Sequence, residues 1–225
     1  MNKNKIVITN CAVLKPDFNI VFAQDVVLED DKITAIRDAG QIEKNATIIK
    51  GDGKLVMPGL VDAHTHVCQQ LLRGRTLDEY PMVWARILVP YESNLTPEDV
   101  YWSTKLACLE KIKAGTTAFA DSGGRYMEQA IEAVAESGMR ASITRSTADM
   151  GSMMPDNMLA SAEANLQATE ELYKKYHGFA DGRINIWFGL RCNSPFFIAK
   201  KLISLRFSKA DLKAGKCKTI IRLFF

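Results

Sequence analysis

The 225-residue sequence predicts an α/β fold, an incomplete (β/α)8 barrel preceded by a small β-rich segment. Three observations lead to this prediction. Short segments rich in β-branched residues fill the first quarter of the chain, strand and helix patterns then alternate, and the alternation contains four units. A complete barrel has eight such units in about 250 residues, so four units correspond to half a barrel.

Residues 1–57 are expected to form the β-rich segment. Its expected strands are the β-branched runs 6–13, 25–28, 33–36 and 46–49 and the apolar run 55–57. Residues 29–32 are all charged and suit a hairpin turn, and Gly51-Asp52-Gly53 gives the turn before the last run. The short strands and polar turns therefore predict a small sheet ahead of the barrel.

Residues 58–190 carry the alternation of strands and helices. The expected strands cover 59–64, 116–120, 140–144 and 184–190, and the expected helices cover 97–114, 126–137 and 157–176. Thr96 suits the N-cap of the first helix because Pro97 and two acidic residues follow it, and Gly115 ends that helix. Strands that alternate with helices in this way pair in parallel, so a parallel sheet is expected.

Residues 191–225 depart from this pattern. The segment from Lys200 to Phe225 contains eight Lys or Arg and one acidic residue, a balance of +7, whereas the preceding residues carry −4. Basic residues among apolar clusters could bind nucleic acid or anionic lipid, but no organised motif for either is present. A solvated tail is the simpler interpretation, and the abrupt change in charge is what translation of a disrupted reading frame would give.

The composition indicates a protein of the cytoplasm. The hydrophobic share of 47% and the charged share of 24% are ordinary for a soluble globular chain. The five cysteines are scattered without a CxxC pair, which argues against a zinc knuckle or a disulfide scaffold and suggests reduced thiols. The N-terminus lacks the apolar run of a signal peptide, and no run approaches the roughly 18 apolar residues of a membrane span.

Two histidines at the end of the first barrel strand carry the chemistry. Side chains two residues apart in a strand share a face, so His64 and His66 are expected to project together. At the C-terminal end of a barrel strand that face lines the active-site mouth, where two imidazoles could each give a nitrogen to one divalent metal. A purely structural pair remains the alternative, although two of the chain's three histidines lie here.

The segment from Met57 to His66, MPGLVDAHTH, resembles the first-strand signature of the amidohydrolase superfamily. The similarity extends over roughly residues 1–190, through Leu71-Leu72-Arg73-Gly74, Leu95-Thr96-Pro97-Glu98-Asp99, Ala114-Gly115-Thr116-Thr117 and Gly138-Met139-Arg140-Ala141. The wider context resembles the aminohydrolase and chlorohydrolase branch, which includes guanine, cytosine and S-adenosylhomocysteine deaminases. The resemblance implies a small β-sandwich fused to a (β/α)8 barrel, a divalent metal for which zinc is favoured over iron, and a small-molecule substrate.

The resemblance also implies roles for individual residues. His64 and His66 match the two metal ligands of the first strand. Trp84 lies where related deaminases place an aromatic ring on the purine, and Arg145 matches an arginine that contacts the substrate of adenosine-derivative deaminases. The alternatives are a core position for Trp84, because it lies in an apolar helix, and a surface position for Arg145.

Four further residues are expected to support the structure rather than the reaction. Arg73 and Glu110 suit packing and local ion pairing. Asp121 ends the second strand and at most supports the metal ligands. His177 lies at the polar end of the last helix, where it is expected to face solvent and to interact favourably with the helix dipole.

The chemistry of the family needs groups that this chain is not expected to provide. Related deaminases take two more histidines, a glutamate and an aspartate from strands five, six and eight, so no catalytic residue is assigned here. The sequence allows metal-dependent hydrolysis of a non-peptide C–N bond, ancestrally deamination of an aminopurine-type ring amine. It equally allows a truncated, non-catalytic remnant, and an interaction module with a basic tail is a third hypothesis. The open edge of half a barrel also allows self-association, whereas neither nucleic acid nor a membrane is an expected partner.

Overall fold

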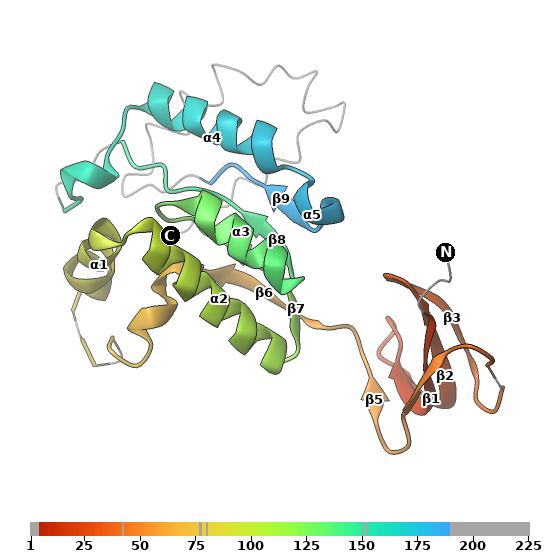
Figure 1. Ribbon diagram of the computed structural model, residues 1–225. Helices are drawn as coiled ribbons and strands as arrows, with labels where there is room; N and C mark the ends of the chain where they lie inside the picture. Colours follow the sequence, from red (N-terminus) through yellow and green to blue (C-terminus); the bar gives the residue numbers. More distant parts are fainter. Residues whose placement is uncertain are drawn as a thin grey trace. The chain divides into compact units, whose positions relative to one another are not determined.

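The computed structural model describes residues 5–41, 43–76, 78–79, 81–149, 151 and 153–189, and the divergent tail expected at 191–225 lies outside them. The chain divides into two compact units, with the boundary between Gly59 and Leu60 (Figure 1). The boundary expected from the sequence lies two residues earlier. In the described residues the first unit contains strands alone, and the second alternates strands with helices.

The first unit is built around one five-stranded sheet. Its strands are β1 (Lys5–Leu14), β2 (Ile20–Glu29), β3 (Lys32–Asp38), β4 (Thr47–Lys50) and β5 (Leu55–Val56). The order is β3-β2-β1-β4 with β5 also beside β1, and β2 is antiparallel to both of its neighbours. All five expected strands are present. The strand β2 begins five residues earlier than expected because Ile20 and Val21 pair with the end of β1.

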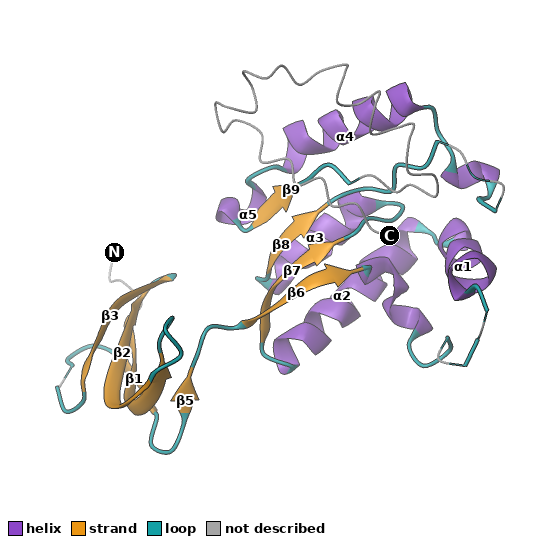
Figure 2. Cartoon of the chain, turned by 180° about the vertical axis from the view of Figure 1, so that it is seen from behind, coloured by secondary structure: helices purple, strands orange, loops and turns teal. Residues whose placement is uncertain are grey.

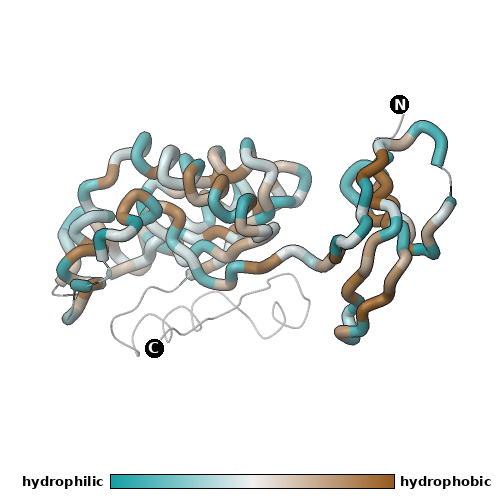
Figure 3. Tube along the Cα trace, turned by 90° about the horizontal axis from the view of Figure 1, so that it is seen from below, coloured by the Kyte–Doolittle hydropathy of each residue, from teal (hydrophilic) through white to brown (hydrophobic). Residues whose placement is uncertain are grey.

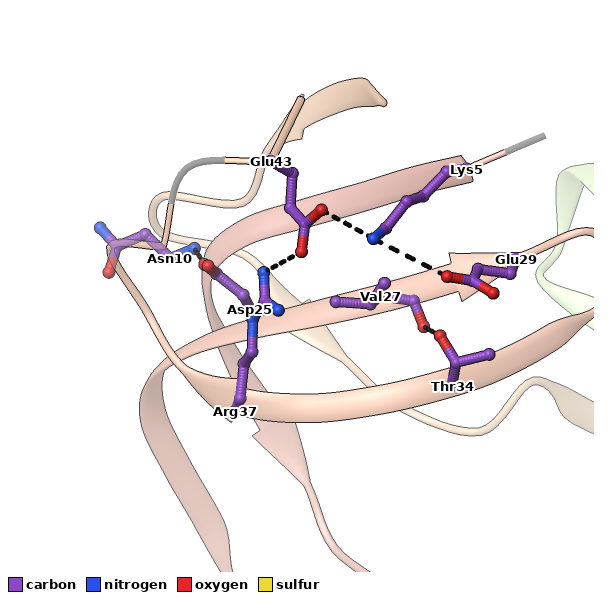
Figure 4. Close-up of polar contacts among 8 residues, drawn as sticks. All are labelled: Lys5, Asn10, Asp25, Val27, Glu29, Thr34, Arg37 and Glu43. Carbon is purple, nitrogen blue, oxygen red and sulfur yellow. Dashed lines mark hydrogen bonds and ion pairs between the residues drawn. The ribbon is translucent and has the colours of Figure 1, made fainter. Parts of the chain in front are cut away.

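Charged side chains link the strands of this sheet (Figure 4). The carboxylate of Glu43, in the loop after β3, lies 2.7 Å from both Lys5 Nζ and an Arg37 guanidinium nitrogen. Hydrogen bonds from these two side chains hold the pKa of Glu43 below its usual range. The buried Asp25 accepts a hydrogen bond from the backbone N–H of Asn10 at 3.0 Å. Figure 3 shows polar residues at the turns of this unit and apolar stretches along its strands.

The second unit contains a parallel sheet, as the alternating pattern predicts. Its strands are β6 (Leu60–Thr65), β7 (Thr116–Asp121), β8 (Arg140–Ile143) and β9 (Ile184–Ile186). They lie in the order β6-β7-β8-β9, and every neighbouring pair is parallel. The C-terminal ends of all four strands therefore meet along one edge, which is where a barrel carries its active site.

The helices of this unit begin and end largely where capping residues predict. They are η1 (Val67–Leu72), η2 (Trp84–Leu88), α1 (Val89–Asn94), α2 (Pro97–Lys113), α3 (Met127–Ser137), η3 (Asp156–Met158), α4 (Ala162–Tyr176) and α5 (Phe179–Gly182). Thr96 and Asp99 form a capping box at the start of α2. The expected start of the last long helix, at residue 157, is wrong. The side chain of Ser161 caps α4 by accepting from the N–H of Ala164, and η3 is a separate turn before it.

The strands of the second unit bury one face beneath helices. Figures 1 and 2 view the sheet from opposite sides and show α2 and α3 covering the same face of it. On that face Phe119, Ile143 and Ile184 are buried and belong to one apolar cluster with Ile131 and Val134 of α3. Burial of this kind contributes about 1.5–3 kcal/mol for each large apolar side chain. Among the described residues no helix is both long and apolar enough to cross a membrane.

Candidate metal centre

The strand β6, which contains His64 and ends one residue before His66, is irregular. Asp62 and Thr65 both lie within hydrogen-bond distance of Lys111 Nζ on α2, at 2.5 and 3.3 Å. Residues three apart in a regular strand would face opposite sides, but the pairing of β6 with β7 shifts register between these two. Asp62 and Thr65 therefore both face α2, and Lys111 holds the histidine strand to that helix.

The two imidazole rings lie next to each other, as the spacing of the histidines predicts. The ring centroids of His64 and His66 are 5.4 Å apart, and the ring planes meet at 79°. Two imidazoles on one tetrahedral ion, with metal–nitrogen distances of about 2.0–2.1 Å, would have ring centroids about 5 Å apart. The spacing of the pair therefore fits two ligands of a single metal ion.

Hydrogen bonds hold the Nδ1 atom of each ring. His66 Nδ1 lies 2.9 Å from the carbonyl oxygen of Gly123, and His64 Nδ1 lies 3.1 Å from the hydroxyl of Ser122. A carbonyl oxygen only accepts, so His66 Nδ1 carries the hydrogen, and the neutral ring then presents a lone pair on Nε2. Metal-ligating histidines are typically held through the other ring nitrogen in this way.

Asp121, the last residue of β7, lies buried beside the histidine pair. Its two carboxylate oxygens accept the backbone N–H groups of Val67 and Gly123, each at 2.8 Å. Burial raises the pKa of Asp121 above its usual value, against the effect of these two hydrogen bonds and of the nearby His66. These contacts place Asp121 in support of the pair, the only role that its position in the sequence suggests.

The segment after the histidines is fixed to α2 as well. The hydroxyl of Ser103 donates to the carbonyl oxygen of Val67 at 2.7 Å and accepts from the N–H of Gln70 at 3.0 Å. The side chain of Gln70 bonds to Glu110, which also forms an ion pair with Arg73. The expectation of local ion pairing for Arg73 and Glu110 is therefore confirmed, and the structure shows that they pair with each other.

The histidine pair provides two ligands, fewer than a complete catalytic site has. Among the residues that the structure describes, no group of three or more His, Cys, Asp or Glu side chains is placed to hold a metal ion. Catalytic zinc usually has three protein ligands and an open position. The described part of the chain therefore fits a divalent metal through His64 and His66, with further ligands still required for a catalytic site.

Trp84 packs against a small apolar cluster. It begins the short helix η2 and lies, partly buried, against an apolar cluster of Val89, Ala148, Met154 and Met158. Three of these residues, Ala148, Met154 and Met158, belong to the segment between β8 and α4. This contact accords with the core alternative for Trp84, and the purine-binding role remains a prediction.

Arg145, two residues past the end of β8, lines a cavity of about 470 Å³ between α3 and α4. Arg125, Glu128 and Glu171 line the same cavity, so its wall carries charges of both signs. Burial lowers the pKa of Arg145, and the charge of Glu171 acts in the opposite direction. Residues that follow β7 and β8 also line this cavity, and a substrate-binding role for Arg145 remains a prediction.

The contacts of His177, the third histidine, link secondary-structure elements to each other. It is exposed at the C-terminal end of α4, as expected, and stacks on Tyr173 with ring centroids 4.3 Å apart. Its Nδ1 accepts a hydrogen bond from the backbone N–H of Ile186 at 3.3 Å. This bond, which the sequence did not reveal, links the end of α4 to β9.

Comparison with known families decides which family carries this arrangement. The sequence pattern of the Amidohydrolase family matches residues 55–192, more than half of the chain, and includes both histidines. The chain belongs to the amidohydrolase family. The histidine pair and all four strands of the parallel sheet lie within the matched residues.

Curated relatives of this amidohydrolase chain act on adenosine derivatives. A 5-methylthioadenosine/S-adenosylhomocysteine deaminase of Carboxydothermus hydrogenoformans is 36% identical over 187 residues, which are 82% of this chain and 41% of the relative. A 5'-deoxyadenosine deaminase of Methanosarcina acetivorans is 38% identical over 188 residues, with the same coverage of both chains. The chain thus spans about two fifths of the length of these relatives.

Solved structures confirm the fold of this amidohydrolase chain. An atrazine chlorohydrolase from Arthrobacter aurescens TC1, complexed with zinc, superposes with a TM-score of 0.72 at 21% identity, covering 82% of this chain and 46% of that one. A guanine deaminase from C. acetobutylicum with bound guanine superposes with a TM-score of 0.71 at 19% identity, covering 84% and 46%. The expected class, part of a (β/α)8 barrel behind a β-rich segment, is confirmed.

Proposed function

We propose that this chain provides the first two metal ligands of an aminohydrolase that deaminates the purine ring of an adenosine derivative. The observation that carries the proposal is the histidine pair itself. The ring centroids lie 5.4 Å apart at the C-terminal end of β6, and each ring has its Nδ1 within hydrogen-bond distance of the loop after β7. Relatives named as adenosine-derivative deaminases match 82% of the chain, which supports this substrate class.

The residues of this chain would hold and orient the metal. A divalent metal held there would supply a bound water of lowered pKa, for attack on the ring carbon that carries the amine and release of ammonia. His66 would bind the metal through Nε2, because its Nδ1 donates to the carbonyl oxygen of Gly123. His64 would bind through Nε2 with its Nδ1 donating to the hydroxyl of Ser122. Ser122 and Gly123 would keep the two rings at the angle at which they converge.

Zinc is the metal that we propose in preference to iron. Imidazole nitrogen suits both ions, so the two histidines alone do not separate them. The atrazine chlorohydrolase that shares this fold is described as a zinc complex, which supports zinc. Metal-depleted protein offered zinc and ferrous iron in parallel should bind zinc more tightly, and the reverse order would contradict this choice.

Trp84 and Arg145 are proposed to bind the substrate. Arg145 lines the cavity between α3 and α4 close to the strand ends, where a guanidinium can bind an anionic or hydroxyl-bearing group of a nucleoside derivative. Trp84 packs next to the segment after β8, where an indole face could lie against a purine. Replacing either residue should raise KM more than it lowers kcat if the role is substrate binding.

Ammonia release tests the proposed reaction. The chain should be incubated with saturating zinc and, separately, with S-adenosylhomocysteine, 5'-methylthioadenosine, 5'-deoxyadenosine and guanine. Metal-dependent ammonia release from an adenosine derivative that disappears in His64→Ala is the expected result. If wild-type protein that binds zinc releases no ammonia from any of these substrates, deamination by this chain is refuted.

One observation favours a second function, metal binding without turnover. The described residues hold no third metal ligand beside the histidine pair. A site with two protein ligands binds metal weakly and gives little activation of water. Zinc bound at one ion per chain without any ammonia release would support this second function.

The partner that we propose is a small molecule, with no role for nucleic acid or for a membrane.

We also propose that copies of the chain associate. In the described residues β6 pairs with β7 alone, so its other edge presents unpaired backbone, and Leu60 and Val61 on this strand are 53% and 69% exposed. An open strand edge with exposed apolar residues favours pairing between chains.

A further inference from the structure

Asp121 connects two segments that are far apart in the sequence and that both touch His66. One carboxylate oxygen accepts the backbone N–H of Val67, the residue directly after His66, at 2.8 Å. The other accepts the backbone N–H of Gly123 at 2.8 Å. Asp121 is only 4% exposed, so both hydrogen bonds are shielded from water. Loss of either bond would leave a buried polar group without a partner.

Gly123 links Asp121 to the imidazole ring of His66. Its carbonyl oxygen lies 2.9 Å from His66 Nδ1, and a carbonyl can only accept, so the ring must donate. The Gly123 backbone is itself held at a φ of +89°, and its Cβ position would lie 2.7 Å from the carbonyl carbon of Arg145. The residue that provides the acceptor for the His66 ring is therefore held by Asp121, and its α-carbon packs closely against the backbone of Arg145, two residues after β8.

We propose that Asp121 is a positioning residue that sets the tautomer and orientation of His66. By fixing the backbone on both sides of the ring, it keeps the hydrogen on Nδ1 and leaves Nε2 as the metal ligand. The part of the proposal that concerns metal binding rests on the proposed function. The part that concerns the tautomer does not, because it applies to the metal-free chain.

A merely structural Asp121 would predict a different set of effects. A buried carboxylate that only stabilises a loop would lower the free energy of unfolding when changed, while His66 in the folded fraction kept its tautomer. If Asp121 is a positioning residue, its substitution changes which nitrogen of the His66 ring carries the hydrogen. The state of that hydrogen is therefore the quantity to measure.

Nuclear magnetic resonance of protein with isotope-labelled histidine measures the tautomer of His66 directly. The two ring nitrogens of a neutral imidazole have distinct chemical shifts that report which one carries the hydrogen. In the wild type we expect His66 protonated at Nδ1, with slow exchange of that hydrogen. A wild-type His66 protonated mainly at Nε2 would overturn the proposal without any variant.

Asp121→Asn is the informative variant, because asparagine keeps the shape and loses one of the two acceptors. We expect a mixture of His66 tautomers and faster exchange of the Nδ1 hydrogen. Asp25→Asn is the matched control: Asp25 is also buried and accepts a backbone N–H, from Asn10 at 3.0 Å in the first unit. Unchanged His66 signals in folded Asp121→Asn, or equal changes in both variants, would overturn the proposal.

Zinc affinity then separates this proposal from the proposed function. Loss of an outer contact of this kind typically lowers metal affinity about 10–100-fold, and we expect a loss in that range for Asp121→Asn and none for Asp25→Asn. If wild-type protein binds no zinc but Asp121→Asn still shifts the His66 tautomer, the proposed function fails and the positioning role stands. If wild-type protein binds zinc and Asp121→Asn binds it equally well, the positioning role fails and the proposed function stands.

Discussion

At the scale of single residues, Gly123 combines two constraints beside the histidine pair. Its φ of +89° is a conformation that L side chains rarely adopt, and an added Cβ would lie 2.7 and 2.8 Å from the carbonyl carbon and oxygen of Arg145. Because the obstacle is backbone, it cannot rotate away. Gly123→Ala should therefore lower the free energy of unfolding by at least about 2 kcal/mol, from strain alone of about 1–3 kcal/mol and the added clash.

Gly138 offers the control for this prediction. It also has a positive φ, of +80°, but nothing lies within 4 Å of its Cβ position. Urea unfolding of both alanine variants should show a larger loss for Gly123→Ala, together with weaker zinc binding in that variant alone. Equal losses in the two variants would contradict the importance of the contact with Arg145.

The ion pair between Lys111 and Asp62 ties α2 to the histidine strand. The two side chains are 13% and 33% exposed, and Asp62 also accepts the backbone N–H of His64 at 3.2 Å. Because the pair is partly buried, we expect Lys111→Met or Asp62→Asn to cost about 1–2 kcal/mol, between the values for surface and buried pairs. A double-mutant cycle by urea unfolding should give a coupling energy well above zero. Additive losses of unfolding free energy in the two single variants would contradict a stabilising ion pair between Lys111 and Asp62.

The sequence predicted the side chains of the candidate site better than the contacts between them. The spacing of His64 and His66 predicted neighbouring rings, because a period of two depends only on local backbone. The partners of those rings, Ser122 and Gly123, lie 57 to 58 residues later, and no local pattern reports them. The register shift in β6 was equally hidden, because it depends on how the strand pairs with β7.

At the scale of elements, the capping box of α2 is the clearest case of local control. The Thr96 hydroxyl accepts from the N–H of Asp99 at 3.2 Å, and the Asp99 carboxylate accepts from the N–H of Thr96 at 2.8 Å. Thr96→Ala should lower the free energy of unfolding by about 1 kcal/mol, the usual effect of losing an N-cap. Chemical denaturation at neutral pH checks this value, and a change below a few tenths would contradict the role of the cap.

The same box has a defined pH dependence. Hydrogen bonds from the hydroxyl and the backbone of Thr96 hold the pKa of Asp99 below its ordinary value. Its contribution is therefore fully present above about pH 4, the value in the unfolded chain, and is lost as pH falls through the lower folded value. The difference in stability between wild type and Asp99→Asn should be constant from pH 5 to 7 and shrink below pH 4. A difference that grows on acidification would contradict this sign.

Element boundaries were predictable where a cap or a glycine marks them. The helices that end at Gly115 and Gly138 do so close to the expected residues because these glycines adopt a positive φ. The start of α4 was missed because Asp156–Met158 form a separate turn and the N-cap is Ser161. The strand β2 was predicted too short, because the pairing of Ile20 and Val21 with β1 is a tertiary contact.

At the scale of the whole molecule, the open edge of β6 predicts association between chains. Strand pairing through this edge would bury Leu60 and Val61, which are exposed in the single chain. Analytical ultracentrifugation should show a molar mass that rises with concentration, and Val61→Lys should reduce it because a charged residue on an edge opposes pairing. Thr117→Lys, at an exposed position of the neighbouring strand β7, is the control. A monomer at all concentrations would contradict association.

The most direct test of the central claim, that His64 and His66 form a metal-binding pair, is a zinc titration of the purified chain followed by calorimetry. The expected result is one zinc ion per chain, with binding lost in His64→Ala and in His66→Ala. His177→Ala, the change at the remaining histidine, should bind zinc as the wild type does. Zinc binding that survives the removal of both His64 and His66, or wild-type protein that binds no zinc at all, would contradict the claim.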